Sequence, residues 1–288
     1  MTRPPTHAGI IRPARRPAGW SAPGSSPRGA ADDPTLVPGP GEDLCHLLGD
    51  WRVFQKVGGH RWSLDDLLTG WLAWRVARDA PPARVLDLGT GVGSVLMMTA
   101  WHFPEARLVG VEAQAVSADL ARRSLRYNGV AARAAVHDGD LRDFDGAHGF
   151  DLVTGTPPYF PPGSAVQSDA VQKGPCRHEH RGGVDDYVAA AARAAAPGAT
   201  VVLCHAALQR DRLLGAAARA GWDAMIVCDV AGRDGKAALV TVAAFRVPPG
   251  GAGLAPQHEE FSVRGRDLQW TERFIQVRRE MGMPHGRA

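Results

Sequence analysis

The sequence has no long hydrophobic run and only a few scattered cysteines. No apolar stretch approaches the roughly 18 residues of a membrane-spanning helix, so we expect no membrane partner. The cysteines form no CxxC pair and lack the dense spacing of a secreted disulfide scaffold. We therefore expect reduced thiols and a cytoplasmic protein. The cysteines are Cys45, Cys176, Cys204 and Cys228.

Lysine is also scarce, and the charge is close to balanced. Lys56, Lys173 and Lys236 are the only lysines among 33 basic residues, and 30 acidic residues leave a net charge of +3. This charge permits an anionic partner without requiring one. A chain of 288 residues that is 44% hydrophobic is long enough for one α/β domain of ordinary size with tails.

Composition divides the chain into three parts. Residues 1–42 are rich in Pro, Gly, Ala, Ser and Arg, which predicts a disordered extension, or an organellar transit peptide because arginine precedes the first acids. Residues 43–248 carry the apolar periodicity of a folded domain. Residues 249–288 form a basic extension whose arginines either contact RNA or lie on a solvated face.

Strands and helices alternate through the middle part. A helix with apolar residues at helical spacing is expected over 64–76, ahead of the first strand. This order predicts a mostly parallel sheet covered by helices on both faces, finished by an antiparallel hairpin. We expect strands at 84–88, 107–111, 133–136, 151–154, 200–205, 223–229 and 237–247, and helices at 94–102, 115–127, 184–196 and 208–220.

A glycine turn follows the first of these strands. Gly89, Gly91 and Gly93 suit a backbone that turns with positive φ or lies against a ligand, although a tight turn without a ligand has the same composition. Glu112 ends the next strand, where an acid accepts hydrogen bonds from the ribose of an adenosine-containing cofactor. These residues fit either a nicotinamide cofactor or S-adenosylmethionine (SAM).

Two further acids favour SAM. Asp87 precedes the glycines, where a carboxylate attracts the cationic methionine end of this cofactor. Asp140 follows the third strand. This place resembles the one where SAM-dependent methyltransferases have an acid against the adenine amino group. The alternative role for Asp140 is that of a helix N-cap.

The fourth strand runs into Thr156-Pro157-Pro158-Tyr159, which resembles the (N/D/S)PP(Y/F) motif of SAM-dependent methyltransferases that act on planar nitrogens. The resemblance implies the class I, Rossmann-like α/β fold, a mostly parallel seven-stranded sheet with a final antiparallel strand. It also implies that Thr156 and the Pro157 carbonyl accept the N–H bonds of an amine, while Tyr159 stacks on a flipped base.

Other landmarks narrow the resemblance. The segments at 56–74, 176–188 and 235–245 are similar, in the same order, to parts of the bacterial tRNA1(Val) adenine-N6 methyltransferase family. Asp65 matches that family's aspartate in KVGTD. The resemblance implies methylation of adenine N6 in tRNA or another RNA, with SAM as cofactor and no metal. His178 and His180 alone seldom make a metal site, and we expect their segment to pack the substrate loop or contact phosphate.

This sequence departs from the family pattern at two places. Thr156 replaces an asparagine, and KVGTD is interrupted, reading KVGGHRWSLD. The acceptor could therefore be a protein glutamine, guanine N2 or a small metabolite. The protein could also be a non-catalytic SAM- or RNA-binding paralogue, or a nicotinamide-dependent dehydrogenase.

Overall fold

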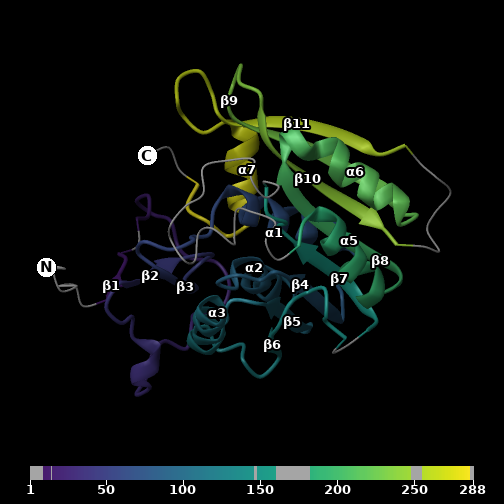
Figure 1. Ribbon diagram of the computed structural model, residues 1–288. Coiled ribbons are helices and arrows are strands. Elements are labelled where there is room, and N and C mark those ends of the chain that lie inside the picture. The colour runs from purple at the N-terminus through teal and green to yellow at the C-terminus, as the bar shows by residue number, and fades with distance from the viewer. Residues whose placement is uncertain (1–8, 14, 146–147, 160–181, 248–254, 286–288) are drawn as a thin grey trace, which may run out of the picture.

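The computed structural model describes residues 9–13, 15–145, 148–159, 182–247 and 255–285. Its elements follow the alternation that the sequence predicts from β4 to β10 (Figure 1). In chain order they are β1 (Ile10–Ile11), η1 (Pro34–Leu36), β2 (Glu42–His46), β3 (Arg52–Lys56), α1 (Leu64–Ala77), β4 (Arg84–Leu88), α2 (Ser94–His102), β5 (Arg107–Glu112), α3 (Ala115–Tyr127), β6 (Ala134–Asp138), β7 (Phe150–Gly155), α5 (Val184–Ala194), β8 (Ala195–Ala206), η3 (Ala207–Gln209), α6 (Arg210–Arg219), β9 (Asp223–Arg233), β10 (Ala238–Arg246), β11 (Gln257–Arg264) and α7 (Glu272–Glu280).

The large sheet has the strand order β11-β9-β10-β8-β7-β4-β5-β6. Neighbours from β8 through β7, β4 and β5 to β6 are parallel, whereas β10 is antiparallel to both β8 and β9. The predicted antiparallel hairpin is therefore confirmed. The expected number of seven strands is wrong for the described residues, because β11 pairs in parallel with β9 and makes an eighth.

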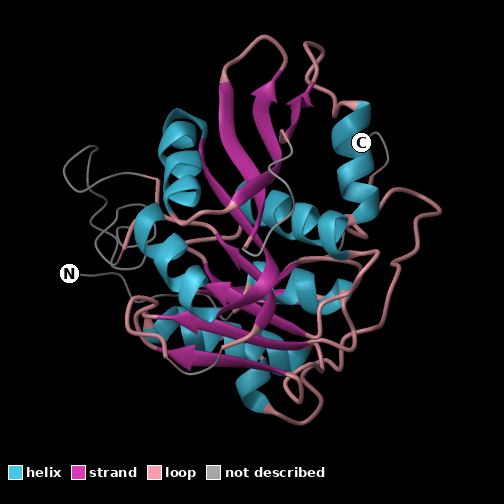
Figure 2. Cartoon of the chain, turned by 90° about the vertical axis from the view of Figure 1, so that its right-hand side faces the viewer, coloured by secondary structure: helices cyan, strands magenta, loops and turns pink. Residues whose placement is uncertain are grey.

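Helices cover both faces of this sheet (Figure 2). Side chains alternate along β8, so that Val202 and Cys204 join one apolar cluster and Val201 and Leu203 join the other. The first cluster contains residues of α1, α2, α3 and α7, and the second contains residues of α5 and α6. This double burial explains why β4, β7 and β8 are nearly continuous apolar runs. No helix of the described residues is long and apolar enough to cross a membrane.

The N-terminal residues contact the domain, although the sequence predicts a disordered extension there. β1, β2 and β3 form a separate three-stranded sheet, in which Ile10 pairs with Asp43 and Ile11 with Leu44. The composition of residues 1–42 does not predict these contacts, because they depend on a few polar side chains, such as Arg12 and Arg123, and not on apolar periodicity. The division at 1–42, 43–248 and 249–288 stays a prediction.

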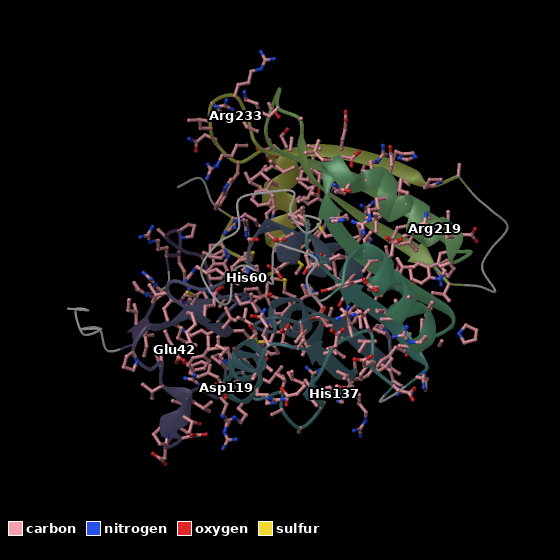
Figure 3. The ribbon with its side chains drawn as sticks, in the orientation of Figure 1. Glu42, His60, Asp119, His137, Arg219 and Arg233 are labelled. Carbon is pink, nitrogen blue, oxygen red and sulfur yellow. The ribbon has the colours of Figure 1, made fainter. Side chains whose placement is uncertain are left out.

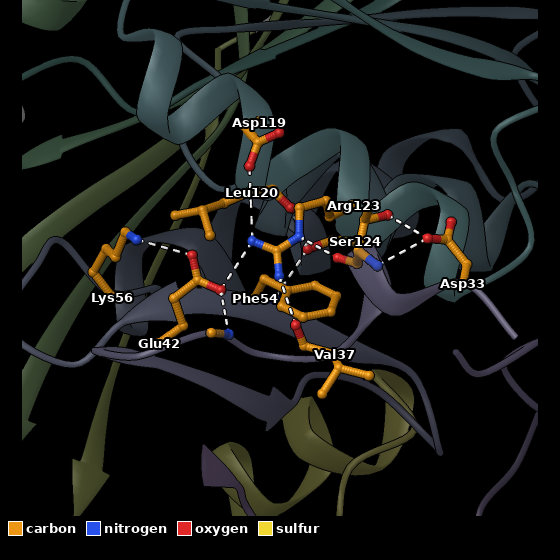
Figure 4. Close-up of polar contacts among 11 residues, drawn as sticks. Asp33, Val37, Glu42, Phe54, Lys56, Asp119, Leu120, Arg123 and Ser124 are labelled. Carbon is orange, nitrogen blue, oxygen red and sulfur yellow. Dashed lines mark hydrogen bonds and ion pairs between the residues drawn. The ribbon is translucent and has the colours of Figure 1, made fainter. Parts of the chain in front are cut away.

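Arg123 on α3 is the main anchor of this segment. Glu42 and Asp119 lie near one another beside the N-terminal strands (Figure 3), and Arg123 lies between them (Figure 4). Its guanidinium donates to the carbonyl oxygens of Thr35 (2.7 Å) and Val37 (3.1 Å) and to Glu42 (2.9 Å). Its side chain is only 10% exposed, so little solvent screens these contacts.

Replacing Arg123 by methionine should lower the free energy of unfolding by about 1.5–3 kcal/mol, because the buried Glu42 and two backbone carbonyls lose charged hydrogen bonds. Urea unfolding measures this loss. Arg126→Met is the matched control on the same helix, since Arg126 pairs with Asp33 on an exposed surface and such pairs contribute about 0–1 kcal/mol. Equal losses in the two variants would contradict the anchoring role.

Candidate active site

Two loops that the sequence singles out begin at the same edge of the sheet. β4 and β7 are parallel neighbours, and Leu88 lies opposite Gly155 in register. The glycine turn starts at the next residue of one strand, Gly89, and the Pro-Pro-Tyr turn at the next residue of the other, Thr156. β5 lies on one side of β4 and β7 on the other, so this edge is also the point where strand order reverses.

A cavity of about 470 Å³ lies between these loops, within the usual range for small-molecule sites. It joins three parts of the chain: the segment before α1, the ends of β4, β5 and β6, and the Pro-Pro-Tyr turn. Its described lining residues are Gly59, His60, Arg61, Ser63, Asp65, Gly89, Gly91, Val111, Glu112, Ala113, Gln114, Gly139, Asp140, Leu141, Thr156, Pro157, Pro158, Tyr159 and Tyr187.

The glycine turn needs residues without a side chain. Gly89, Gly91 and Gly93 have φ values of +62°, +58° and +84°, which L-amino acids with a side chain rarely adopt. A Cβ on Gly89 would lie 2.0 Å from the hydroxyl oxygen of Tyr187. A Cβ on Gly91 would meet no atom nearer than 4.0 Å, so the backbone there is open to a ligand.

Glu112 holds the glycine turn from the end of β5. One carboxylate oxygen accepts a hydrogen bond from the Gly91 N–H (2.8 Å), and the other accepts from the Gln114 N–H (2.7 Å). The structure thus places Glu112 both in the cavity wall and against the turn.

Asp140 lies in the cavity wall beyond β6. It forms an ion pair with Arg142 (2.6 Å) and accepts a hydrogen bond from the Arg142 backbone N–H (2.9 Å). No helix begins at this turn, so the alternative role of helix N-cap does not apply. Its role toward a cofactor stays a prediction.

Asp87, which precedes the glycine turn, and Gly93, its last glycine, are not among the described lining residues of the cavity. Asp87 is 2% exposed and accepts hydrogen bonds from the hydroxyls of Thr90 and Thr154. Burial raises the pKa of Asp87 to about 6. These hydrogen bonds of Asp87 connect β4 to the turn and to β7, and its predicted contact with a cofactor stays a prediction.

The Pro-Pro-Tyr turn is tied to the start of α1. The Tyr159 hydroxyl donates a hydrogen bond to Asp65 (2.6 Å), the aspartate that the family pattern singles out. Burial, followed by the charges around it, raises the pKa of Tyr159, so this hydroxyl remains a proton donor. The Tyr159 ring lies 5.7 Å from the ring of His205. This contact network fixes the orientation of the tyrosine ring beside the cavity.

Three residues near the cavity carry no signal in the sequence. Tyr187 lies on α5 far along the chain, and only the packing of α5 against β4 brings it to Gly89. His205 is completely buried, and neither of its ring nitrogens has a hydrogen-bond partner among the described residues. Burial lowers the pKa of His205 to about 4, so its ring is neutral. Asp66 is buried in the first turn of α1, next to Asp65.

The segment containing Arg177, His178, Glu179 and His180 lies outside the described residues. Its expected role in packing the substrate loop or contacting phosphate therefore stays a prediction. Among the described residues, no group of three or more His, Cys, Asp or Glu side chains could hold a metal ion.

Comparison with known proteins agrees with this geometry. A family model described as "Methyltransferase domain" matches residues 85–167, which include the glycine turn, Glu112 and the Pro-Pro-Tyr turn. The chain has a methyltransferase domain of the class I fold. The match covers the part of the domain that builds most of the cavity wall.

Two curated relatives of this methyltransferase domain carry the same name. The tRNA1(Val) (adenine(37)-N6)-methyltransferase of Porphyromonas gingivalis is 30% identical over 158 residues, which are 53% of this chain and 60% of that protein. The protein of the same name from Aeromonas hydrophila is 29% identical over 230 residues, covering 78% of this chain and 89% of that one. The chain thus matches less than two thirds of the Porphyromonas protein and most of the Aeromonas protein.

Solved structures share the fold of the methyltransferase domain at low identity. A protein from Agrobacterium tumefaciens, described as a predicted O-methyltransferase, has a TM-score of 0.56 at 17% identity and covers 76% of this chain and 98% of that one. The Pyrococcus horikoshii protein TYW2, solved in complex with MeSAdo, has a TM-score of 0.52 at 14% identity, with 73% of each chain covered. Such identities establish the fold alone.

Gly89→Ala should destabilise the protein by about 1–3 kcal/mol more than Gly91→Ala. Both variants strain a positive-φ position, but only the first forces a Cβ against Tyr187. Urea unfolding of both variants measures the difference. Adding Tyr187→Phe to Gly89→Ala removes the nearest clashing atom and should recover part of the loss. Equal effects of the two alanines would show that Tyr187 does not restrict the turn.

Asp66 should make stability fall as the pH rises from about 4 to 8. It is buried and accepts hydrogen bonds from the Ser63 N–H and the Ser94 hydroxyl, both at 2.8 Å. Burial first, then the charge of Asp65, raises its pKa from 3.8 to about 8. The folded protein therefore binds more protons than the unfolded chain inside this window, and stability is greatest at its acidic end.

Unfolding in urea at pH 5 and pH 8 tests this dependence. The wild type should lose up to about 1.4 kcal/mol per pH unit relative to Asp66→Asn, in which no carboxyl titrates at this position. Asp79→Asn is the matched control, because the Asp79 side chain is 95% exposed. If Asp66→Asn kept the full pH dependence of the wild type, another group would be responsible.

Proposed function

We propose that this protein is a SAM-dependent N-methyltransferase that transfers a methyl group to an exocyclic amine, and that the amine is adenine N6 in a tRNA. One observation carries the proposal: the glycine turn and the Thr156–Tyr159 turn open into one cavity. A methyl donor and its acceptor must lie within contact distance, and these turns are suited to hold one each.

The residues around the glycine turn suit a nucleoside cofactor. The open backbone at Gly91 allows a ligand to lie against it, and the Glu112 carboxylate lines the same cavity, where ribose hydroxyls could donate to it. Asp140 and Leu141 line the wall beyond β6, where an adenine ring would meet a carboxylate and an apolar side chain. We assign cofactor contact to Gly89, Gly91, Glu112 and Asp140, and a supporting role to Asp87 and Gly93.

When bound, SAM supplies a methyl group on a sulfonium sulfur. The amine is a weak nucleophile because its lone pair is delocalised into the ring. The Thr156 hydroxyl and the Pro157 carbonyl accept its two N–H bonds and turn the lone pair toward the methyl group. Gly89, Gly91, Glu112 and Asp140 would hold SAM, which would supply the methyl group of the new N–C bond as its S–C bond breaks, and the proton lost from nitrogen would pass to water. S-adenosylhomocysteine and the methylated amine are the products.

Tyr159 is suited to hold the base in this reaction. Its ring flanks the cavity, and the hydrogen bond to Asp65 fixes the ring orientation. Stacking on an aromatic ring contributes about 1–3 kcal/mol per base and suits a base removed from its helix. The relatives from Porphyromonas gingivalis and Aeromonas hydrophila bear the name of a tRNA adenine methyltransferase, which supports tRNA as the substrate class. We also propose a cytoplasmic location.

Incubation with labelled SAM and bulk tRNA, followed by nucleoside analysis by mass spectrometry, tests the proposal. We expect N6-methyladenosine, which would also show that Thr156 serves where the related family carries asparagine. N2-methylguanosine would keep the reaction and change the base. Labelled protein or metabolites without labelled RNA would overturn the RNA assignment, and no transfer to any acceptor would overturn the enzyme assignment.

Tyr159→Ala should reduce methyl transfer by about a hundredfold or more while leaving the affinity for S-adenosylhomocysteine nearly unchanged, because Tyr159 positions the acceptor and not the donor. Tyr159→Phe keeps the ring and loses only the hydrogen bond to Asp65, so it should be affected less. Initial rates and calorimetric titrations measure the two effects. Loss of cofactor binding in Tyr159→Ala would contradict this division of roles.

A further inference from the structure

The interruption of the KVGTD pattern brings a charged side chain into the cavity. Residues 59–63 separate KVG from the helix that begins at Leu64, and Gly59, His60, Arg61 and Ser63 all line the cavity. His60 lies near the middle of the molecule (Figure 3). The proposed function assigns neither cofactor contact nor acceptor contact to any of these four residues.

A buried carboxylate fixes the position of Arg61. Asp43 on β2 is completely buried, and both of its oxygens accept hydrogen bonds from Arg61 Nη1, at 3.0 and 2.9 Å. Arg61 Nη2 also donates to Cys45 Sγ (3.1 Å). Within the described residues, these contacts leave the Nε–H and one Nη2 N–H of the guanidinium for a ligand. The Arg61 side chain is 38% exposed.

The charge at this point is not balanced by Asp43 alone. Arg12 also binds the Asp43 carboxylate, at 2.9 and 2.7 Å, so one negative group faces two guanidinium groups. The cluster of Asp43, Arg12 and Arg61 therefore carries an excess of one positive charge. Arg12 is not among the described lining residues, so the excess charge meets the cavity through Arg61.

The other charged groups of the cavity wall are acids. Asp65, Glu112 and Asp140 are carboxylates, and Arg61 is the one side chain with a permanent positive charge among the described lining residues. SAM carries two positive groups, its sulfonium and its ammonium, and one negative group, its carboxylate. The three acids favour the positive groups and repel the carboxylate. Arg61 offers the matching site for the carboxylate.

We propose that Arg61 binds the carboxylate of the methionine moiety of SAM and of its product. This inference rests on the proposed function. A guanidinium edge with two N–H donors matches the two oxygens of a carboxylate, and Asp43 holds the guanidinium in place before the ligand arrives. The segment that interrupts the family pattern thus supplies a contact to the cofactor.

Calorimetric titration with two ligands tests the assignment. S-adenosylhomocysteine carries the carboxylate, and 5′-methylthioadenosine has the same nucleoside and sulfur without it. Arg61→Met should weaken binding of S-adenosylhomocysteine by about tenfold to a hundredfold and change binding of methylthioadenosine by less than about threefold. Arg126→Met is the control, since Arg126 pairs with Asp33 and is not among the described lining residues of the cavity, and both affinities should stay within about threefold.

Two other outcomes of these titrations would contradict the role of Arg61 or the proposed function. Equal weakening of both ligands by Arg61→Met, or no weakening of either, would overturn the inference and leave the proposed function standing. A wild type that binds neither ligand would overturn both. If Arg61→Met does not fold, Arg61→Gln keeps a donor toward Asp43 while removing the charge, and the same loss of discrimination between the two ligands is expected.

Discussion

The parallel register of β4 and β7 determines where the site lies. Because Leu88 pairs with Gly155, the glycine turn and the Thr156–Tyr159 turn leave the sheet at neighbouring positions. A shift by one residue would turn the apolar side chains of β7 to the wrong face. The burial of both faces of β4 and β7 therefore positions the glycine turn relative to Thr156 and Tyr159.

Buried carboxylates then hold the loops that this register brings together. Glu112 holds Gly91, Asp87 links β4 to Thr90 and Thr154, and Asp43 holds Arg61. In each case an acid of the framework binds a donor of a loop, so the free energy of burying charge is offset by hydrogen bonds. This arrangement fixes the cavity wall and leaves the backbone at Gly91 open to a ligand.

The periodicity of apolar residues in the sequence predicts much of the fold. The sequence predicts only some of the residues that build the cavity. Buried parallel strands such as 84–88 are apolar runs bounded by turns, so the sequence predicts them well. β11 is an edge strand whose apolar residues, Phe261 and Val263, alternate with polar ones and give a weak signal. Tyr187 and Arg61 escape sequence reasoning because only tertiary packing brings them to the cavity. Asp87 hydrogen-bonds to Thr90 and Thr154, and its contact with a cofactor stays a prediction.

A crystal structure of the protein with S-adenosylhomocysteine tests most directly the claim that one cavity holds donor and acceptor. The ribose hydroxyls should bind Glu112, and the sulfur should face the turn between Thr156 and Tyr159 within reach of a stacked base. A ligand bound elsewhere, or one whose sulfur points away from Tyr159, would show that the glycine turn and the Pro-Pro-Tyr turn do not serve a single reaction.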